Sequence, residues 1–342
     1  MEAGPEEHLE KLYRDNTPEF AFRAKTPEEA RVWKDSLKAI FLKDLGGFPH
    51  EKTALRPRII EEEQCDGYVR QRVVITTDDQ LDMPLYLLIP DNRKGKLPVV
   101  VTCHGHGTGS RDNVGLKPDG SFKEGDHGYS KSFGLELVKQ GFLVVAPEIL
   151  GFAERMFKGD MNRWPEVRNS CHRLSTYYLT FGKTLTAARV YEIFRTIDYL
   201  ETRPEADMQN IGCMGISGGG LVGAYASIFD ERIKASVISG FTNTFKDSFL
   251  AMQHCVCMFT PGVLRHAEMP DLIGLIAPRP LLIEAGIADK NFPIAGVRKA
   301  LSELETVYRV WGCEQSLAKD IFDGGHEVSG KIAYDWLERQ LR

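Results

Sequence analysis

The sequence predicts an α/β protein whose mostly parallel sheet of eight strands carries helices on both faces. Short apolar runs of β type alternate with helix-like segments along most of the chain. A Gly-x-Ser-x-Gly pentapeptide at 215–219 directly follows one of these runs and opens a segment of small residues. The 342 residues are enough to bury the core of one large domain with insertions.

Eight apolar runs are expected to be strands. The first two follow each other without a helix between them, which predicts an antiparallel edge of the sheet. The others alternate with helical patterns such as the one at 187–200, and this alternation is typical of parallel strands covered on both faces. The eight runs are 72–76, 83–89, 99–103, 143–146, 211–214, 235–239, 281–285 and 318–322.

Residues 1–66 are expected to form a helical arm ahead of the main domain at 67–342. Thr26, followed by a proline and by Glu29 at the third helical position, predicts a helix start with a capping box. The helix should continue to about residue 45, where two glycines end it. We find no catalytic grouping in this arm.

Two stretches, 151–183 and 240–276, do not fit the alternation of strands and helices. Each follows the carboxyl end of an expected strand. Ligands bind at that edge of an open α/β sheet, so both stretches are predicted to be insertions that cap a site.

Composition excludes several classes of partner. The net charge is −5 with both signs dispersed, so no broad basic surface is available for nucleic acid. No apolar run is long enough to cross a membrane, and the first ten residues contain four glutamates instead of the apolar core of a signal peptide. We therefore expect a cytoplasmic protein and leave open whether it forms a homo-oligomer.

The seven cysteines are odd in number, which favours free thiols over a disulfide framework. Cys103 and Cys213 fall in apolar runs, where they should pack as small hydrophobic side chains. Cys255 and Cys257 are separated by one residue, a spacing that matches no common zinc site. The sequence therefore predicts no metal.

Ser217 is the candidate nucleophile. It lies at the centre of the pentapeptide, between an apolar run and a helix, which is the context of a nucleophile elbow. In such an elbow the serine has strained backbone geometry, and its Oγ projects above the sheet. Glycines at 219 and 223 and the alanine at 226 should give the following helix a smooth face towards the sheet.

A serine hydroxyl needs a base, and His326 is the candidate. It follows the last expected strand through a flexible Asp-Gly-Gly loop. His254 and His266 also lie downstream of the serine, but they precede the strand at 281–285. These two are interpreted as cap histidines with local partners.

The base needs an orienting acid, and we favour Asp289. It lies in the loop after the strand at 281–285, and the interval to His326 leaves room for one helix and one strand. Asp320 and Asp323 are competitors because they are close to His326 in sequence. Asp320 falls in or at the start of the last strand, and Asp323 has the character of a turn residue.

The negative oxygen that forms during acyl transfer needs two backbone donors. Gly218 should supply one, and the His-Gly-rich loop after the strand at 99–103 should supply the other through His106, with Gly105 and Gly107 as alternatives. His104 is expected to hold this loop by hydrogen bonding. A metal on His104 and His106 is not favoured, because no acidic or cysteine partner is evident in the sequence.

A few residues are weaker candidates for substrate binding. Glu148 and Arg155 are expected to form a salt bridge that shapes the rim of the pocket. Trp164 and Tyr177, in the first insertion, could stack on a sugar or an aromatic ester. Such side chains are equally common in ordinary packing. His104 and Arg155 complete the candidate substrate-binding set.

Several of these motifs together resemble the acetyl xylan esterase and dienelactone-hydrolase-like branch of the α/β-hydrolases. They are the run DYLETRP at 198–204, Ile211-Gly212 before the elbow, the His-Gly loop, and Gly325-His326-Glu327. Catalytic domains of prolyl-oligopeptidase type share much of this pattern. The resemblance covers residues 68–342 and implies an α/β-hydrolase fold and hydrolysis of short acyl esters without a cofactor.

Carried over to this chain, the resemblance implies Ser217 as nucleophile, Asp289 as acid and His326 as base. The cephalosporin-C deacetylase and acetyl xylan esterase family proper has Arg-Gly-Gln where this chain has residues 104–106, and glutamine where it has Gly218. Dienelactone hydrolases use a cysteine nucleophile. The sequence thus predicts a serine carboxylesterase for small esters; a peptidase or amidase, and a weakly catalytic binding protein, are the alternatives.

Overall fold

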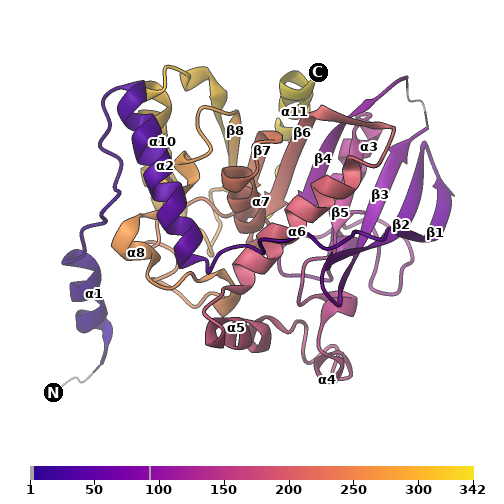
Figure 1. The fold of residues 1–342 in the computed structure, drawn as a ribbon, viewed down its shortest axis with the longest axis horizontal. Helices are drawn as coiled ribbons and strands as arrows, with labels where there is room; N and C mark the ends of the chain where they lie inside the picture. The colour runs from indigo at the N-terminus through magenta and orange to yellow at the C-terminus, as the bar shows by residue number, and fades with distance from the viewer. Residues whose placement is uncertain (1–3, 92–93) are drawn as a thin grey trace.

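The computed structural model describes residues 4–91 and 94–342, and it is built on one nine-stranded sheet (Figure 1). Residues 1–3, which belong to the N-terminal segment expected to lack a signal peptide, lie outside the described residues. Across the sheet the strands follow the order β1-β2-β3-β5-β4-β6-β7-β8-β9. Their bounds are β1 Arg58–Cys65, β2 Tyr68–Asp78, β3 Leu81–Pro90, β4 Leu97–Cys103, β5 Leu143–Pro147, β6 Ala206–Ile216, β7 Ile233–Ser239, β8 Leu281–Gly286 and β9 Leu317–Phe322.

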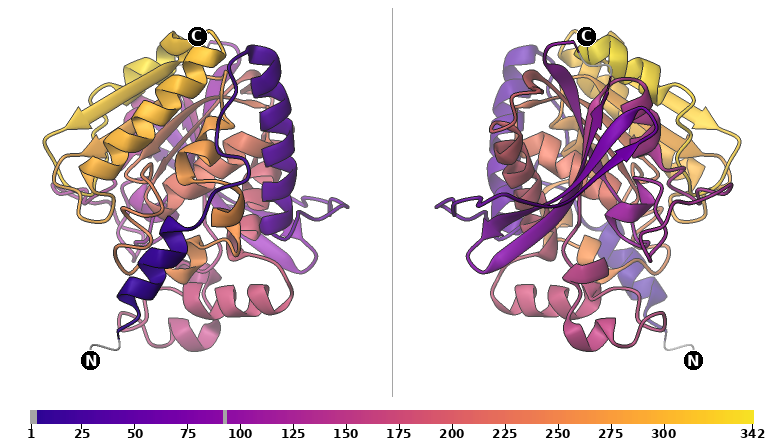
Figure 2. Two further views of the ribbon diagram at one scale, coloured as in Figure 1. Left: turned by 90° about the vertical axis from the view of Figure 1, so that its left-hand side faces the viewer. Right: turned by 90° about the vertical axis from the view of Figure 1, so that its right-hand side faces the viewer.

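All eight expected strands are present, and the expected number of strands is wrong by one because β1 was missed. This strand lies inside the segment 1–66 that was expected to be a helical arm. Nearly all of its residues are exposed and three are consecutive glutamates, so it has no apolar pattern to reveal it. It pairs with β2 in antiparallel orientation and forms the edge of the sheet, which faces the viewer in the right-hand view of Figure 2.

The sheet is antiparallel at this edge and parallel elsewhere. Strands β1, β2, β3 and β5 pair in antiparallel orientation. Strand β5 then pairs with β4 in parallel, and all pairs from there to β9 are parallel. This arrangement agrees with the predicted antiparallel edge. It also places the carboxyl ends of β4, β6, β7 and β8 side by side.

Helices cover both faces of the sheet, as the alternation predicts. Along β4, Val99, Val101 and Cys103 face one apolar cluster and Val100 faces the other, which is the two-residue period of a strand buried on both sides. The first cluster contains residues of α2 Pro27–Asp44, α6 Leu185–Leu200, α7 Gly218–Phe229 and α10 Ile294–Val310, and the second contains residues of α3 Phe133–Lys139 and α11 Ala333–Leu341.

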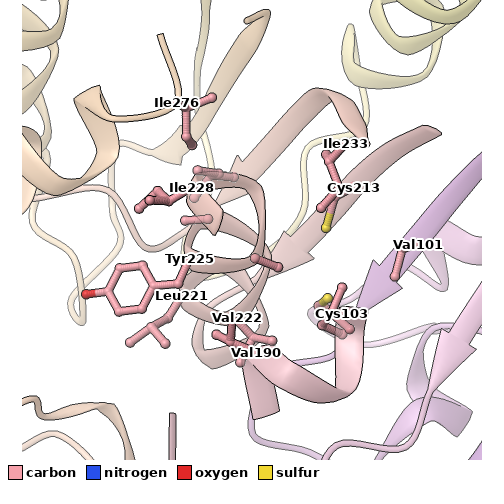
Figure 3. Close-up of a cluster of buried hydrophobic side chains, with 14 of the residues drawn as sticks. Val101, Cys103, Val190, Cys213, Leu221, Val222, Tyr225, Ile228, Ile233 and Ile276 are labelled. Atoms are coloured by element: carbon pink, nitrogen blue, oxygen red, sulfur yellow. The ribbon is translucent and has the colours of Figure 1, made fainter. Parts of the chain in front are cut away.

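Helix α7 lies unusually close to the sheet. A Cβ atom at Gly219 would come within 2.1 Å of the carbonyl oxygen of Cys103, and one at Gly223 within 3.1 Å of the sulfur of Cys213. Figure 3 shows both thiols on the sheet, with Leu221 and Val222 of α7 in the same cluster. The predicted smooth helix face and the predicted burial of these two cysteines are both confirmed.

The N-terminal segment contains two helices, α1 Glu6–Arg14, which was not expected, and α2. Thr26 Oγ1 accepts a hydrogen bond from the Glu29 amide at 3.2 Å, so the predicted N-cap is confirmed. The Glu29 carboxylate accepts from the Lys25 amide, and not from the Thr26 amide that a capping box requires. Buried Trp33 and Phe41 attach α2 to the core.

Both insertions contain short helices. The first holds η2 Ala153–Arg155, α4 Lys158–Met161 and α5 Cys171–Thr180, and the second holds η3 Val256–Met258, α8 Val263–His266 and α9 Met269–Gly274. Helix α5 contacts η3, so the two insertions meet each other. Two further 3-10 turns are η1 Ser110–Asp112 and η4 Glu314–Ser316. None of the described helices is long and apolar enough to cross a membrane.

Candidate active site

Ser217 sits in a strained turn between β6 and α7. Its φ of 58° and ψ of −124° lie in a region that residues with a side chain rarely adopt. Its amide donates to the carbonyl of Ser239 at the end of β7 (2.9 Å), and its carbonyl accepts from Leu221 in the first turn of α7 (3.0 Å). The backbone on both sides therefore holds the strained conformation that the pentapeptide predicts for an elbow.

The two flanking glycines of the pentapeptide are sterically required. A Cβ atom at Gly215 would lie 2.2 Å from the carbonyl oxygen of Gly219, inside the turn itself. Gly219 in turn lies against the carbonyl of Cys103 on β4. Since the obstacles are backbone atoms, no side-chain movement can relieve them.

Asp289 and His326 form a hydrogen-bonded pair at the carboxyl edge of the sheet. The distance between His326 Nδ1 and Asp289 Oδ2 is 2.8 Å. The carboxylate is buried, and its other oxygen accepts from the amides of Asn291 (2.8 Å) and Phe292 (3.1 Å). With Oδ1 held by two amides, Oδ2 is oriented towards the imidazole.

The loops that carry the acid and the base are in direct contact. The amide of Ile287 donates to the carbonyl of Phe322 (2.9 Å), and that of Ala288 donates to the carbonyl of Gly324 (2.9 Å). The ring of His326 lies against Gly240, where a Cβ atom would be 3.2 Å from Nδ1. Gly240 directly follows Ser239, the acceptor of the Ser217 amide, so the imidazole lies beside the elbow.

Two aromatic rings flank the imidazole of His326. The Tyr129 ring is nearly parallel to it, with a centroid distance of 6.3 Å and an interplanar angle of 6°. The Phe292 ring has a centroid distance of 5.7 Å and an interplanar angle of 20°. These rings restrict rotation of the imidazole. The His326 side chain remains 21% exposed.

Asp320 and the two other downstream histidines have partners elsewhere. Asp320 lies in β9 and accepts from the hydroxyl of Ser329 at 2.6 Å. His254 Nε2 pairs with the Ser248 hydroxyl (2.9 Å), and His266 Nδ1 pairs with Asp44 (2.7 Å). Among the three aspartates considered from the sequence, Asp289 is the one whose carboxylate is hydrogen-bonded to His326.

Gly218 lies against the His106 ring, and the preceding Gly105 lies against Ser217. A Cβ atom at Gly218 would be 3.0 Å from His106 Nδ1, and one at Gly105 would be 3.1 Å from Ser217 Cβ. Within the described part of the chain, neither the Gly218 amide nor the His106 amide donates to a protein acceptor. Both N–H groups are thus available for an oxygen of a ligand.

His104 anchors this loop by hydrogen bonds of its ring nitrogens. Its Nδ1 lies 2.8 Å from the carbonyl oxygen of Gly105, and its Nε2 accepts from the amide of Ile149 at 3.0 Å. The side chain is fully buried and both ring nitrogens are engaged within the protein. His104 therefore supports the loop, as expected, and the expectation that it binds substrate is wrong.

Tyr129 is a candidate site residue that the sequence analysis missed. Its buried hydroxyl lies next to the Gly105 amide and donates to no acceptor in the described chain. The hydroxyl and Ser217 Cβ lie 2.8 and 3.1 Å from the position that a Cβ atom of Gly105 would occupy. Tyr129 lies in a loop without any local motif, so the sequence carried no signal for it.

The expected pairing of Arg155 with Glu148 is wrong. The guanidinium of Arg155 makes two contacts with the Glu192 carboxylate, at 2.5 and 2.7 Å, and donates to the backbone carbonyl of Glu148. The Glu148 carboxylate instead accepts from the amide and hydroxyl of Ser110. Arg155 is buried in an internal ion pair, so it is not a substrate-binding residue.

Trp164 and Tyr177 are exposed, at 41% and 50% of their surface. Tyr177 packs against Phe157 at a centroid distance of 5.8 Å, and its hydroxyl accepts from Arg173 Nε at 3.5 Å. These contacts stay within the first insertion. The structure therefore does not place either residue against Ser217 or His326.

Three cysteines surround His106, and the expectation that it has no cysteine partner is wrong. Its Nε2 lies 3.4 Å from Cys257 Sγ and 3.9 Å from Cys171 Sγ. The donor atoms of His106, Cys171, Cys255 and Cys257 all lie within 4.8 Å of one another. Since they come from three separate segments, no local spacing could have revealed this cluster.

Glu284 lies buried in β8, next to Ser239 at the end of β7. It is hydrogen-bonded to the Ser239 hydroxyl and to the Gly330 amide. Burial raises the pKa of its carboxyl from the ordinary 4.5 to about 7. Below about pH 4.5 the group is protonated in both the folded and unfolded states. Between 4.5 and 7 only the unfolded state ionises, so stability is lost as the pH rises through this range.

We therefore expect Glu284→Gln, which cannot ionise, to gain stability relative to wild type as the pH rises. The difference in free energy of unfolding between variant and wild type should change by about 3 kcal/mol from about pH 4.5 to about pH 7.5. Urea unfolding at a series of pH values measures it. Glu338→Gln, at a partly exposed carboxylate on α11, is the control. It should leave the pH dependence of the free energy of unfolding as in wild type. If the free energy of unfolding of Glu284→Gln had the same pH dependence as that of wild type, the expected ionisation of Glu284 would be contradicted.

A model of the Abhydrolase family matches residues 7–307. The protein YtaP of Bacillus subtilis (strain 168), whose name describes it as a hydrolase, is 26% identical over 297 residues, which are 85% of this chain and 93% of YtaP. Both Ser217 and Asp289 fall within the range that the family model matches, and His326 follows it.

Solved structures with a similar fold include three proteins described as esterases. One described as an acetyl xylan esterase from Bacteroides fragilis NCTC 9343 has a TM-score of 0.77 and 18% identity and covers 94% of this chain and 83% of its own. A glucuronoyl esterase from Solibacter usitatus has a TM-score of 0.64 and 17% identity, and the match covers 90% of each chain. Acetyl xylan esterase 1 from Thermoanaerobacterium sp. JW/SL YS485 has a TM-score of 0.55 and 16% identity, and the match covers 97% of each chain. At these identities the likeness shows a shared fold.

Proposed function

The chain belongs to the Abhydrolase family, and we propose that it is a serine esterase that hydrolyses small carboxylic esters. The observation that carries this proposal is the Asp289–His326 pair beside a serine in elbow geometry. A nucleophile with an oriented base is what acyl transfer requires. The hydrolase name of YtaP and the esterase names of the similar structures agree with it.

The proposed reaction proceeds through an acyl-enzyme. His326 Nε2 accepts the proton of Ser217 as Oγ attacks the ester carbon, and then gives this proton to the departing alcohol. Water attacks the acyl-enzyme next; it passes a proton to His326, which returns it to Ser217 as the acid leaves. The buried carboxylate of Asp289 keeps Nδ1 protonated and stabilises the imidazolium.

The amides of Gly218 and His106 are proposed to bind the negative oxygen. Neither amide has a protein acceptor among the described residues; Gly218 follows Ser217 directly, and His106 follows Gly105, which lies against Ser217. The imidazole of His106 covers Gly218 and packs edge-on against Phe152 at 5.2 Å. This crowding favours a short acyl group such as acetyl.

A fluorophosphonate probe and an ester panel test the proposal directly. We expect the probe to label Ser217, as identified by peptide mass spectrometry. We expect turnover of p-nitrophenyl acetate to exceed that of longer acyl esters and that of an aminoacyl anilide. A strong preference for the anilide would favour a peptidase, and failure to label Ser217 would favour a binding protein.

Tyr129 is proposed to be a third donor to the negative oxygen, because its buried hydroxyl donates to no acceptor among the described residues and lies next to the glycine loop. We expect Tyr129→Phe to lower kcat for p-nitrophenyl acetate by about 10- to 100-fold with a smaller change in KM. Tyr334→Phe, which removes a hydroxyl from a half-buried tyrosine on α11, is the control. Wild-type kcat in Tyr129→Phe would exclude the role.

A further inference from the structure

We propose that His106, Cys171, Cys255 and Cys257 together bind one zinc ion beside the active site. The four side chains converge from the loop after β4, from the start of α5, and from the turn at η3. No step of the proposed ester hydrolysis uses the three thiols or the His106 ring. The cluster is therefore a second site with its own chemistry.

The spacing of the donor atoms fits tetrahedral coordination. Zinc bound at about 2.3 Å to sulfur and about 2.0 Å to nitrogen places its donors roughly 3.5 to 3.8 Å apart. The distances from His106 Nε2 to Cys257 Sγ and Cys171 Sγ are 3.4 and 3.9 Å. All four donors lie within 4.8 Å of one another, so side-chain movements of at most about 1 Å would bring them to tetrahedral spacing.

The kind of donor selects the metal. Thiolate ligands favour zinc, copper(I) and iron over magnesium or calcium, and three cysteines with one histidine is a common composition of structural zinc sites. Four protein ligands also leave no position for a water molecule or a substrate. The ion would therefore stabilise the structure and would take no part in the reaction.

A buried arginine beside the cluster supplies the charge that such a site needs. Arg189 Nη2 lies 3.1 Å from Cys171 Sγ, and the guanidinium also donates twice to the carbonyl of Leu150. Elsewhere on α6, buried Arg195 pairs with the Asp198 carboxylate. Among the described residues, no carboxylate pairs with Arg189 in the same way.

The formal charges then balance. A zinc ion with three thiolates and a neutral histidine carries one net negative charge, which the guanidinium of Arg189 neutralises. With three neutral thiols instead, the arginine would be a buried cation without an anion, and that arrangement is costly. Arg189 is thus an observation independent of the donor distances.

The position of the site indicates what the ion would do. The ion would join both insertions to the loop that carries His106. The ring of His106 also covers Gly218. Fixing this ring fixes the backbone that is proposed to face the negative oxygen. The zinc ion would thus hold the cap and the donor loop in one arrangement.

Metal analysis of the purified full-length protein tests the proposal. We expect one zinc per chain by plasma mass spectrometry after growth with added zinc and extensive dialysis. Replacement by cobalt should give the thiolate charge-transfer absorption and the visible bands of a tetrahedral site. Cys255→Ser and Cys257→Ser should each weaken zinc binding, and the double variant should abolish it.

Two controls separate this proposal from the esterase proposal. Cys65→Ser changes a partly exposed cysteine on β1 outside the cluster and should retain one zinc. Ser217→Ala should also retain it, because metal binding does not depend on the nucleophile. Loss of activity without loss of zinc in Ser217→Ala would show that the two sites are distinct.

Three results would overturn the zinc site. These are wild-type protein that retains no metal, protein that retains iron or copper at the same stoichiometry, and freshly purified protein in which Cys171 forms a disulfide with Cys255 or Cys257. If the cysteine variants do not fold, the cobalt spectrum of the wild type still decides the question. A spectrum without thiolate bands would exclude cysteine coordination.

Discussion

Ser217→Ala is expected to lower kcat for p-nitrophenyl acetate by about 10⁴-fold or more. The hydroxyl is the proposed attacking group, and no neighbouring side chain on the elbow can replace it. Its backbone is held by the Ser239 and Leu221 hydrogen bonds, which do not involve the side chain. The variant should therefore keep its fold, as judged by thermal unfolding.

Ser227→Ala is the matched control. Ser227 lies on the same helix as the elbow, but it is buried and its hydroxyl bonds to the carbonyl of Gly223 (2.7 Å) and to Ser236 (2.8 Å). This variant should retain nearly full activity and full labelling by a fluorophosphonate. Substantial esterase activity in Ser217→Ala would refute the assignment of the nucleophile.

Asp289→Asn is expected to lower kcat by about 10³- to 10⁴-fold while leaving the geometry intact. The amides of Asn291 and Phe292 both need an acceptor at the Oδ1 position. The asparagine oxygen must therefore stay there, and its NH₂ group must face His326 Nδ1. Nδ1 then becomes an acceptor, the proton moves to Nε2, and the base can no longer take the proton of Ser217.

Asp320→Asn tests the competing acid. This carboxylate accepts from Ser329 in the same region, but it does not bond to His326. We expect only a slight change in kcat, measured with the same ester at several pH values. If Asp320→Asn lost as much activity as Asp289→Asn, the assignment of the acid would have to be revised.

Local chemistry explains what could be predicted. The strands from β2 to β9 carry apolar runs bounded by turns, and the elbow needs its two glycines because backbone atoms occupy the space of a Cβ. The order of Ser217, Asp289 and His326 along the chain could be read directly, because each follows a recognisable strand. β1 was missed because its residues are charged and exposed.

Interactions between distant segments could not be read in this way. Arg155 was assigned to Glu148, seven residues before it, whereas its carboxylate partner is Glu192, 37 residues after it on α6. Tyr129 reaches the donor loop because the long connection between β4 and α3, which carries both, folds back on itself. Polar side chains gain most from partners that are buried with them, and the folded arrangement alone determines which partners those are.

The sequence by itself determined the α/β class, the elbow at Ser217 and the candidate acid and base. These depend on short-range backbone sterics and on the period of apolar residues, which a linear pattern records. The tertiary structure alone decided which carboxylate reaches His326, which hydroxyl faces the donor loop, and that three cysteines surround His106. Their donor atoms lie within a few ångströms although they are up to 151 residues apart in sequence, so only the packing of the two insertions against the sheet could bring them together.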